Sequence, residues 1–286
     1  KEQQDVIEKE RQKYSHKYFD ISKYPLFSIK GFQLNETDKY LFISYDLMIL
    51  DSASANIFIN TLVWLYEHEE EDLPAISYNY RDFILDVKKL NKSNIYKESK
   101  RYWKNKLEDF PQAPELPMKI DPMIIKKSTF NRLYEYFSKE DYIKMKGYAS
   151  QNGVTVSALL LEAYGQTLRF YSGRDKFAVN LTVFNRYPFH EDVKKLLGDF
   201  TSTLLLDFDY VSNEKFMDNC IDIQEKLVNA LEYRYYDGVE FTRDVSRKYA
   251  YKNGKAVMPI VFTSLLFEED VQKSVDKLGD VRWSIG

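Results

Sequence analysis

Residues 39–67 read KYLFISYDLMILDSASANIFINTLVWLYE, and this stretch decides the fold that we expect. Residues 39–47 alternate in the way that places successive side chains on opposite faces of a β-strand. From residue 54 onward the large apolar residues return on one side of a helix, and Asp51 or Ser52 stands where a side chain can cap its first turn. A strand, a short loop and a helix in this order indicate an α/β protein.

The same two periodicities recur along the rest of the chain, so strands and helices are expected throughout. We predict further strands over residues 24–34, 129–137, 176–184, 203–210 and 256–267. We predict helices over residues 2–15, 80–90, 95–110, 139–151, 156–171, 213–235 and 238–249. A length of 286 residues suits one large domain or two lobes of ordinary size.

A proline-rich segment, PQAPELP at residues 111–117, divides the predicted elements. Because proline lacks a backbone donor and fixes φ, this segment fits neither a helix interior nor a central strand. We therefore expect a linker here and a boundary between two lobes, one over residues 1–117 and the other over residues 118–286. The chain begins within a charged helical stretch and ends at residues 281–286 in a strand pattern, so we expect a fragment truncated at both ends.

Composition excludes several classes of protein. The chain carries 41 Lys and Arg against 44 Asp and Glu, and a formal net charge of -3 is not the basic footprint of a nucleic-acid-binding protein. One cysteine and three histidines far apart in the sequence argue against an intramolecular disulfide, a cysteine zinc site and a structural metal. No apolar run approaches the roughly 18 residues of a membrane span, and no secretory leader opens the sequence, so we expect a cytoplasmic protein.

Two carboxylates and one arginine are the first candidates for a site. Asp46 and Asp51, at a strand end and in the following loop, fit an acid/base pair, although an Asp at such a junction more often caps amides or pairs with an arginine. Arg186 follows Asn185 at the end of the strand predicted over residues 176–184, and we hypothesise that it pairs with Asp51. Removal of either residue of such a buried pair can abolish activity even when the removed residue takes no part in the chemistry.

Polar residues also flank two other predicted strands. The sequence GDFTS at residues 198–202, with Asp199 and Thr201, reads by itself as a turn before a strand. Thr263 and Ser264 end an apolar strand; a threonine rarely acts as a nucleophile without a nearby base, but it can donate a hydrogen bond to a reacting group. The chain has no Gly-x-Ser-x-Gly, P-loop or Gly-x-Gly-x-x-Gly sequence, so residue chemistry alone indicates only an α/β protein.

Five segments in one order carry more information than any of them alone. They are FISYD with Asp51, Ser54 and WLY (residues 42–66), YW and the proline segment (102–117), NLTVFNRYPFH (180–190), GDFTS (198–202) and PIVFTS (259–264). In this order they resemble the motifs of the heterocyclization variety of condensation domains from nonribosomal peptide synthetases. Ordinary condensation domains have two histidines before the later aspartate of the first segment, whereas Tyr45 and Asp46 occupy those positions here.

The resemblance implies a fold and a reaction. The expected fold is two α/β lobes like chloramphenicol acetyltransferase, which form a V around a tunnel, with the N-terminal lobe incomplete in this chain. The expected reaction joins an acyl donor to a Cys, Ser or Thr acceptor and then closes a thiazoline or oxazoline ring with loss of water. Both substrates would ride on the phosphopantetheine of upstream and downstream peptidyl carrier proteins beside an adenylation domain. The domain itself would bind no cofactor and no metal.

The resemblance also suggests roles for the candidate residues. Thr263 would act in cyclodehydration together with an aspartate further downstream, beyond Gly286. Asp46 and Asp51 are the other catalytic candidates, although Asp51 with Arg186 would also hold the interface between the lobes. The expected structural or tunnel residues are Ser54, Asn185, Arg186, Asp199, Thr201 and Ser264.

Three alternatives stay open at the level of the sequence. The first is a condensation domain that forms only the amide, which the missing histidine disfavours. The second is a noncatalytic docking platform or an inactive fragment, which the intact Asp46, Asp51, Ser54 and Thr263 disfavour. The third is a freestanding acyltransferase of the same fold, which would need the absent histidine.

Overall fold

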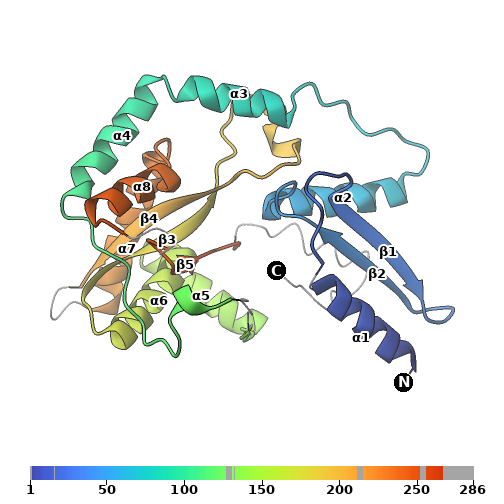
Figure 1. Ribbon diagram of the computed structural model, residues 1–286, viewed down its shortest axis with the longest axis horizontal. Coiled ribbons are helices and arrows are strands. Elements are labelled where there is room, and N and C mark those ends of the chain that lie inside the picture. The colour runs from blue at the N-terminus through green and yellow to red at the C-terminus, as the bar shows by residue number, and fades with distance from the viewer. Residues whose placement is uncertain are drawn as a thin grey trace. The chain divides into compact units, whose positions relative to one another are not determined.

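The structure is a computed structural model that describes residues 2–15, 17–126, 131, 133–210, 215–251 and 256–266 (Figure 1). Contacts within the chain divide it into two compact units. The first unit holds the described residues up to Leu85 and also Asn185–Thr201, and the second holds those of Asp86–Phe184 and Ser202–Leu266. The segment Asn185–Thr201 therefore belongs to the unit that is built from the N-terminal elements.

The first unit is built on a two-stranded antiparallel sheet with a helix on each face. Phe27 lies opposite Tyr45 in the register of the two strands. On one face the rings of Tyr14 and Phe42 stack with centroids 5.8 Å apart, and on the other face Phe58 packs on Phe27 at 6.5 Å between centroids. Its elements are α1 (Glu2–Ser15), β1 (Phe27–Gln33), β2 (Lys39–Tyr45), α2 (Ser52–Glu67), the start of α3 (Tyr80–Leu90) and the 3-10 helix η2 (Glu191–Lys195).

The second unit contains a three-stranded sheet of order β4-β3-β5, in which β5 runs parallel to β3. Figure 1 shows α8 and α6 on opposite sides of this sheet. Its core includes Trp103, 1% exposed, whose ring lies 4.8 Å from that of Phe241, while Tyr164 of α6 packs on Phe262 of β5. Its elements are α4 (Asn94–Leu107), η1 (Pro122–Ile124), α5 (Lys139–Gln151), α6 (Val156–Ser172), β3 (Lys176–Phe184), β4 (Thr201–Asp209), α7 (Phe216–Glu232), α8 (Gly238–Lys248) and β5 (Val261–Phe262).

Helix starts follow from capping residues that the sequence carries. The side chains of Asp51, Ser93, Ser138 and Thr155 each accept a hydrogen bond from a backbone N–H in the first turn of the helix that follows. Gly173 ends α6 with a φ of 64°, in the left-handed region that favours glycine. The predicted helix over residues 139–151 and the predicted strand over residues 176–184 are confirmed in full.

Two strand predictions failed in part although the sequence pattern of a strand is present. In the described residues of these segments, most of the backbone has no neighbouring strand to pair with. Of the described residues 256–266, only Val261–Phe262 pair as a strand, and residue 267 of that prediction lies outside the described residues. Of residues 129–137, the described residues 131 and 133–137 form no strand, and the others lie outside the described residues, as do residues 281–286. Alternation predicts an extended backbone, but a strand also needs a neighbour for its amides and carbonyls.

The proline segment at residues 111–117 is not a linker between the compact units. Ala113 and Leu116 pack against the core of the second unit. The carbonyl of Gln112 accepts a hydrogen bond from Ala178 N at 3.0 Å, so the segment lies beside β3. Proline prevents a helix here, but an extended backbone that packs on a sheet satisfies the same restraint. The lobe boundary at residues 117 and 118 stays a prediction, and it does not coincide with the division between the units.

None of the helices in the described ranges combines the length and the apolar character that crossing a lipid bilayer requires.

Glu162 is a fully buried carboxyl group in the second unit, on α6. It accepts hydrogen bonds from Tyr210 Oη at 3.0 Å and from Gln166 Nε2 at 2.7 Å. Burial raises the pKa of Glu162 above its ordinary value of 4.5, because desolvation penalises the charged carboxylate. The folded protein therefore holds this proton to higher pH than the unfolded chain does.

The change Glu162→Gln should flatten the dependence of stability on pH. The contribution of Glu162 is fully present below its unfolded pKa and is lost as the pH rises through the raised folded pKa. Relative to the variant, the wild type should therefore lose free energy of unfolding as the pH rises above 4.5, the ordinary pKa of a glutamate. Chemical denaturation at several pH values measures this, with Glu225→Gln at an exposed position of α7 as the control. A difference between wild type and Glu162→Gln that does not vary with pH would contradict the expectation.

Candidate functional site: an anchored loop and a hydroxyl pair

Asp51 lies at the N-terminus of α2 and is 2% exposed. As the N-cap, its Oδ1 accepts a hydrogen bond from Ser54 N at 2.7 Å. The same oxygen accepts from Arg186 Nη2 at 3.1 Å, and Oδ2 accepts from Phe200 N at 3.1 Å. One carboxylate thus joins the first turn of α2 to two points of the segment Asn185–Thr201.

Ser54 is fully buried and makes a second link to the same segment. Its Oγ donates to the Gly198 carbonyl at 2.7 Å and accepts from Gly198 N at 3.0 Å and from Arg186 Nη2 at 2.7 Å. A hydroxyl has one hydrogen to donate and two lone pairs, so every hydrogen-bonding site of Ser54 is occupied. An alanine at this position would leave these partners without the hydroxyl that joins them.

Arg186 gathers the remaining polar groups of the loop. Its Nη1 donates to the carbonyls of Val193 and Leu196 at 3.0 and 2.9 Å, and its guanidinium carbon lies 3.9 Å from the centroid of the Phe200 ring. The planar guanidinium supports this combination of hydrogen bonds and ring stacking better than an ammonium group would. The predicted pair of Asp51 and Arg186 is confirmed. We call Asp51, Ser54, Arg186, Gly198 and Phe200 the anchoring cluster.

The anchoring cluster fixes the shape of the loop rather than offering a free base. Both oxygens of Asp51 already accept hydrogen bonds, and a general base has to reach the proton that it removes. The geometry therefore favours a positioning role for Asp51 and Ser54. A direct part for Asp51 in the chemistry stays a prediction.

The polar residues next to the cluster are held by backbone contacts. Asp199 is exposed, its Oδ1 accepts from Thr201 N at 2.9 Å, and its carbonyl accepts from Tyr80 Oη at 2.6 Å. Burial, and then the negative charges of Asp199 and Asp51, raise the pKa of the Tyr80 hydroxyl. Asn185 is 8% exposed, and its backbone N donates to the Phe200 carbonyl at 2.9 Å.

The change Gly198→Ala should lower the free energy of unfolding. A Cβ at residue 198 would lie 2.3 Å from a ring carbon of Tyr80, and that ring cannot retreat without losing its hydrogen bond to the Asp199 carbonyl. Such overpacking costs about 1–3 kcal/mol. Gly147→Ala in α5 is the control, because nothing lies within 4 Å of its added Cβ and alanine favours the helix by up to about 1 kcal/mol. Effects of the same sign in chemical denaturation of the two variants would contradict this reading.

Asp46 shapes the turn between β2 and α2. Its Oδ1 accepts from Met48 N at 2.9 Å, its backbone N donates to the Leu26 carbonyl at 2.9 Å, and its own carbonyl accepts from Ile49 N at 3.1 Å. The side chain is half-buried, and Oδ1 holds a local turn. A role for Asp46 in the reaction stays a prediction.

Thr263 and Ser264 belong to the second unit, directly after β5. Thr263 is exposed, and its Oγ1 lies 2.8 Å from Thr182 Oγ1 on β3. Ser264 Oγ lies 2.9 Å from Ser157 Oγ on α6. The two neighbouring hydroxyls therefore have different partners and different surroundings.

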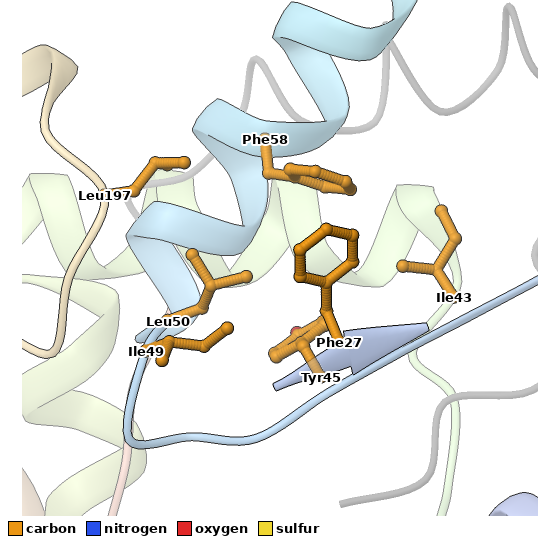
Figure 2. A pocket seen from close by; sticks show the side chains of 7 residues that line it. All are labelled: Phe27, Ile43, Tyr45, Ile49, Leu50, Phe58 and Leu197. Atoms are coloured by element: carbon orange, nitrogen blue, oxygen red, sulfur yellow. The ribbon is translucent and has the colours of Figure 1, made fainter. Parts of the chain in front are cut away.

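A cavity of about 210 Å³ opens in the first unit between the sheet and the N-terminal part of α2 (Figure 2). Apolar side chains and the Tyr45 ring line it, and desolvation raises the pKa of the Tyr45 hydroxyl. Tyr45 stands at one of the two positions that histidines fill in ordinary condensation domains. The lining residues are Phe27, Ile43, Tyr45, Ile49, Leu50, Phe58 and Leu197.

The model of the condensation-domain family matches residues 1–281 of this sequence. The chain belongs to the condensation-domain family. Bacitracin synthase 1 of Bacillus licheniformis is 39% identical over 275 residues, which cover 96% of this chain and 5% of that protein. The phenyloxazoline synthase MbtB of Mycobacterium sp. (strain MCS) is 29% identical over 252 residues, which cover 86% of this chain and 21% of that protein.

The structure of this condensation domain resembles that of the EpoB cyclization-docking bidomain of a nonribosomal peptide synthetase from Sorangium cellulosum. The TM-score is 0.83 at 30% sequence identity, over 92% of this chain and 53% of the other. The chain thus spans about half of that solved structure and a small part of the relatives that it matches in sequence. These likenesses assign it to the heterocyclization type of condensation domain, with a mixed α/β fold.

The condensation domain brings together some of the predicted site residues. Asp51, Ser54 and Arg186 meet in the anchoring cluster, with Asn185 and the 199–201 turn beside it. Thr263 and Ser264 are described within the second unit. Among the described residues no group of His, Cys, Asp and Glu side chains could hold a metal ion.

Sequence reasoning missed Asp192, which is 4% exposed. Its Oδ2 accepts from Ser77 N and Ser77 Oγ, each at 3.1 Å, and its Oδ1 accepts from Lys195 Nζ at 2.8 Å. The hydrogen bond from Lys195, followed by that from the Ser77 amide, lowers the pKa of Asp192 to about 2. The charged run EDVKK at residues 191–195 gives no sign of burial, because the partner at residue 77 is far away in the sequence.

Proposed function

We propose that this domain forms an amide between a carrier-bound acyl donor and a carrier-bound Cys, Ser or Thr, and then converts it to a thiazoline or oxazoline. The observation that carries the proposal is the likeness to the EpoB cyclization domain over nearly the whole chain. The replacement of both histidine positions by Tyr45 and Asp46 also favours it over amide formation alone. The proposal is thus a two-step reaction by one domain.

In the first step the acceptor amine attacks the donor thioester carbonyl. A C–N bond forms, the C–S bond breaks, and the donor phosphopantetheine leaves as a thiol after a proton passes from nitrogen to sulfur. In the second step the acceptor side-chain thiol or hydroxyl adds to the new amide carbonyl. A C–S or C–O bond forms, and the proton of the thiol or hydroxyl passes to the carbonyl oxygen. The C–OH bond then breaks, and the hydroxyl group leaves as water with the proton that the amide nitrogen loses as the C=N bond forms.

In our proposal Thr263 supplies the hydrogen bond that assists departure of the oxygen. Its side chain is exposed at the end of β5, where a substrate can reach it. A positioned donor needs no free base of its own, in contrast to a threonine nucleophile. Asp46 and Asp51 would support this chemistry through the loops that they shape.

The partners in this proposal are an upstream and a downstream peptidyl carrier protein and an adjacent adenylation domain. Phosphopantetheine belongs to the carriers, so the domain needs no cofactor of its own. Delivery of both substrates on tethered arms makes the reaction effectively unimolecular, with effective molarities up to about 10⁵–10⁸ M in model systems. A cytoplasmic location and two chloramphenicol acetyltransferase-like lobes in a V, with residues 1–117 and 118–286 in separate lobes, are the finer parts of the proposal.

The test uses the full natural polypeptide that contains this chain, with both carrier proteins loaded. Intact-mass spectrometry follows the product on the acceptor arm. A product one water lighter than the amide supports heterocyclization. The unchanged amide would assign the domain to condensation only. Folded protein with loaded carriers and no transfer at all would favour a noncatalytic docking platform.

A further inference from the structure

Thr263 has a hydroxyl neighbour on the adjacent strand. Asn180 and Leu181 of β3 lie opposite Val261 and Phe262 of β5 in the parallel register. The next position in this register brings Thr182 Oγ1 to 2.8 Å from Thr263 Oγ1. The contact follows from the strand pairing, so it depends on backbone geometry rather than on a flexible side chain.

The two threonines share one side of the sheet. Successive residues of an extended backbone point to opposite sides, and Ser264 indeed meets Ser157 of α6 instead. Thr263 is exposed, whereas Thr182 is only partly exposed. A substrate can therefore reach the Thr263 hydroxyl, and the less exposed Thr182 hydroxyl lies next to it.

The direction of this hydrogen bond decides what Thr263 can do. A hydroxyl carries one hydrogen and two lone pairs. If Thr263 donated to Thr182, its hydrogen would not be available to a departing oxygen. If Thr182 donates, the Thr263 hydrogen is free, and the bond that it accepts makes it a stronger donor, since hydrogen bonds in a chain polarise one another.

We propose that Thr182 is a positioning residue for ring closure: it donates to Thr263 Oγ1 and so directs the Thr263 hydrogen at the leaving carbonyl oxygen. This inference rests on the proposed function. Thr182 acts through Thr263 and does not itself contact the substrate. Amide formation, which precedes the departure of that oxygen, does not use this pair.

The experiment measures two rates in the full natural polypeptide with loaded carriers, the rate of amide formation and the rate of ring closure. Thr182→Val keeps the shape and removes the hydroxyl, and it should slow ring closure about 3- to 10-fold, as expected for one lost hydrogen bond. Amide formation should keep its rate. Thr182→Ser retains the hydroxyl and should restore ring closure to within about twofold of the wild type.

The double variant Thr182→Val with Thr263→Val gives the sharpest readout. Because Thr182 acts through Thr263, the double variant should close the ring no more slowly than Thr263→Val alone. If the losses of ring-closure rate in the two single variants multiplied in the double variant, the inference would be overturned. Thr167→Val is the control, since it removes the hydroxyl of an exposed threonine on α6 that donates to the Ala163 carbonyl. It should leave both rates unchanged.

The remaining outcomes separate this inference from the function on which it rests. If the wild type forms the ring and the Thr182→Val variant closes it at the same rate, the role of Thr182 is overturned and the proposed function is not affected. An equal fall of both rates together with a lowered melting temperature, without rescue by Thr182→Ser, would assign Thr182 a structural role and overturn the inference. Absence of a ring product from the wild type would overturn the function itself, and the inference with it.

Discussion

Replacing Asp51 with alanine should lower the free energy of unfolding by about 3–5 kcal/mol, the usual effect of removing one partner from a buried ion pair. The variant would leave the Arg186 guanidinium without its carboxylate and the Phe200 amide without its acceptor. It would also remove the N-cap of α2, which contributes typically about 1 kcal/mol. Chemical denaturation of the variant and the wild type measures the difference.

Asp46→Ala is the matched control for this change. Asp46 is five positions earlier and its carboxylate also holds a backbone amide, but it is half-buried in a local turn. We expect a loss of about 0.5–1 kcal/mol, as for the removal of a single ordinary hydrogen bond. Equal losses for the two aspartates would contradict a special place for Asp51 in the anchoring cluster.

A double-mutant cycle with Arg186→Met tests the pair itself. Residues in direct contact couple by about 0.5–3 kcal/mol, so the double variant should lose less stability than the sum of the single variants. Simple additivity would show that the contact at 3.1 Å contributes no coupling. A large coupling would mean that a loss of activity in the Asp51 variant can arise from the damaged loop, without a part for this residue in the chemistry.

Replacing Thr263 with valine should slow ring closure by about 10²–10³-fold, the range typical of removing one hydrogen-bond donor that stabilises a transition state. Valine keeps the volume of the side chain but removes its hydroxyl, which is exposed at the end of β5, where a substrate can reach it. Amide formation should keep its rate, so the uncyclized amide should accumulate on the acceptor arm. Mass spectrometry of that arm over time measures both steps.

The selectivity of this effect is what identifies the role of Thr263. If amide formation and ring closure fell by the same factor, Thr263 would be structural or common to both steps. Thr167→Val supplies the control for loss of a threonine hydroxyl from the same unit. An unchanged melting temperature for Thr263→Val would exclude unfolding as the cause of a selective loss.

Local patterns predicted much of the fold because the forces behind them are local. The strand at β3 and the helices α5 and α6 were predicted from periodicity and caps such as Thr155. The proline segment packs on the core of the second unit, which the sequence did not indicate, since proline excludes a helix but does not tell whether an extended chain packs on a core. The short β5 shows the opposite limit, because an apolar run becomes a strand only where a partner strand meets it.

For the candidate site, too, some features could be predicted from the sequence and others only from the tertiary structure. The motifs pointed to Asp51, Arg186 and Thr263, and the hypothesis of an Asp51–Arg186 pair is confirmed. No pattern indicated that Ser54 would bond both the N–H and the carbonyl of Gly198, or that Asp192 would be buried against Ser77. These contacts join residues more than one hundred positions apart, so only the closed loops of the tertiary structure bring them together.

By itself the sequence determined most element types, narrowed the cap of α2 to Asp51 or Ser52 and indicated the family, because periodicity, side-chain chemistry and ordered motifs are properties of the chain alone. Only the tertiary structure decided that both oxygens of Asp51 accept hydrogen bonds and that Thr182 lies beside Thr263. The physical reason is that a hydrogen bond needs two groups within about 3 Å of each other. Strand register and loop packing, which depend on the whole fold, set that distance.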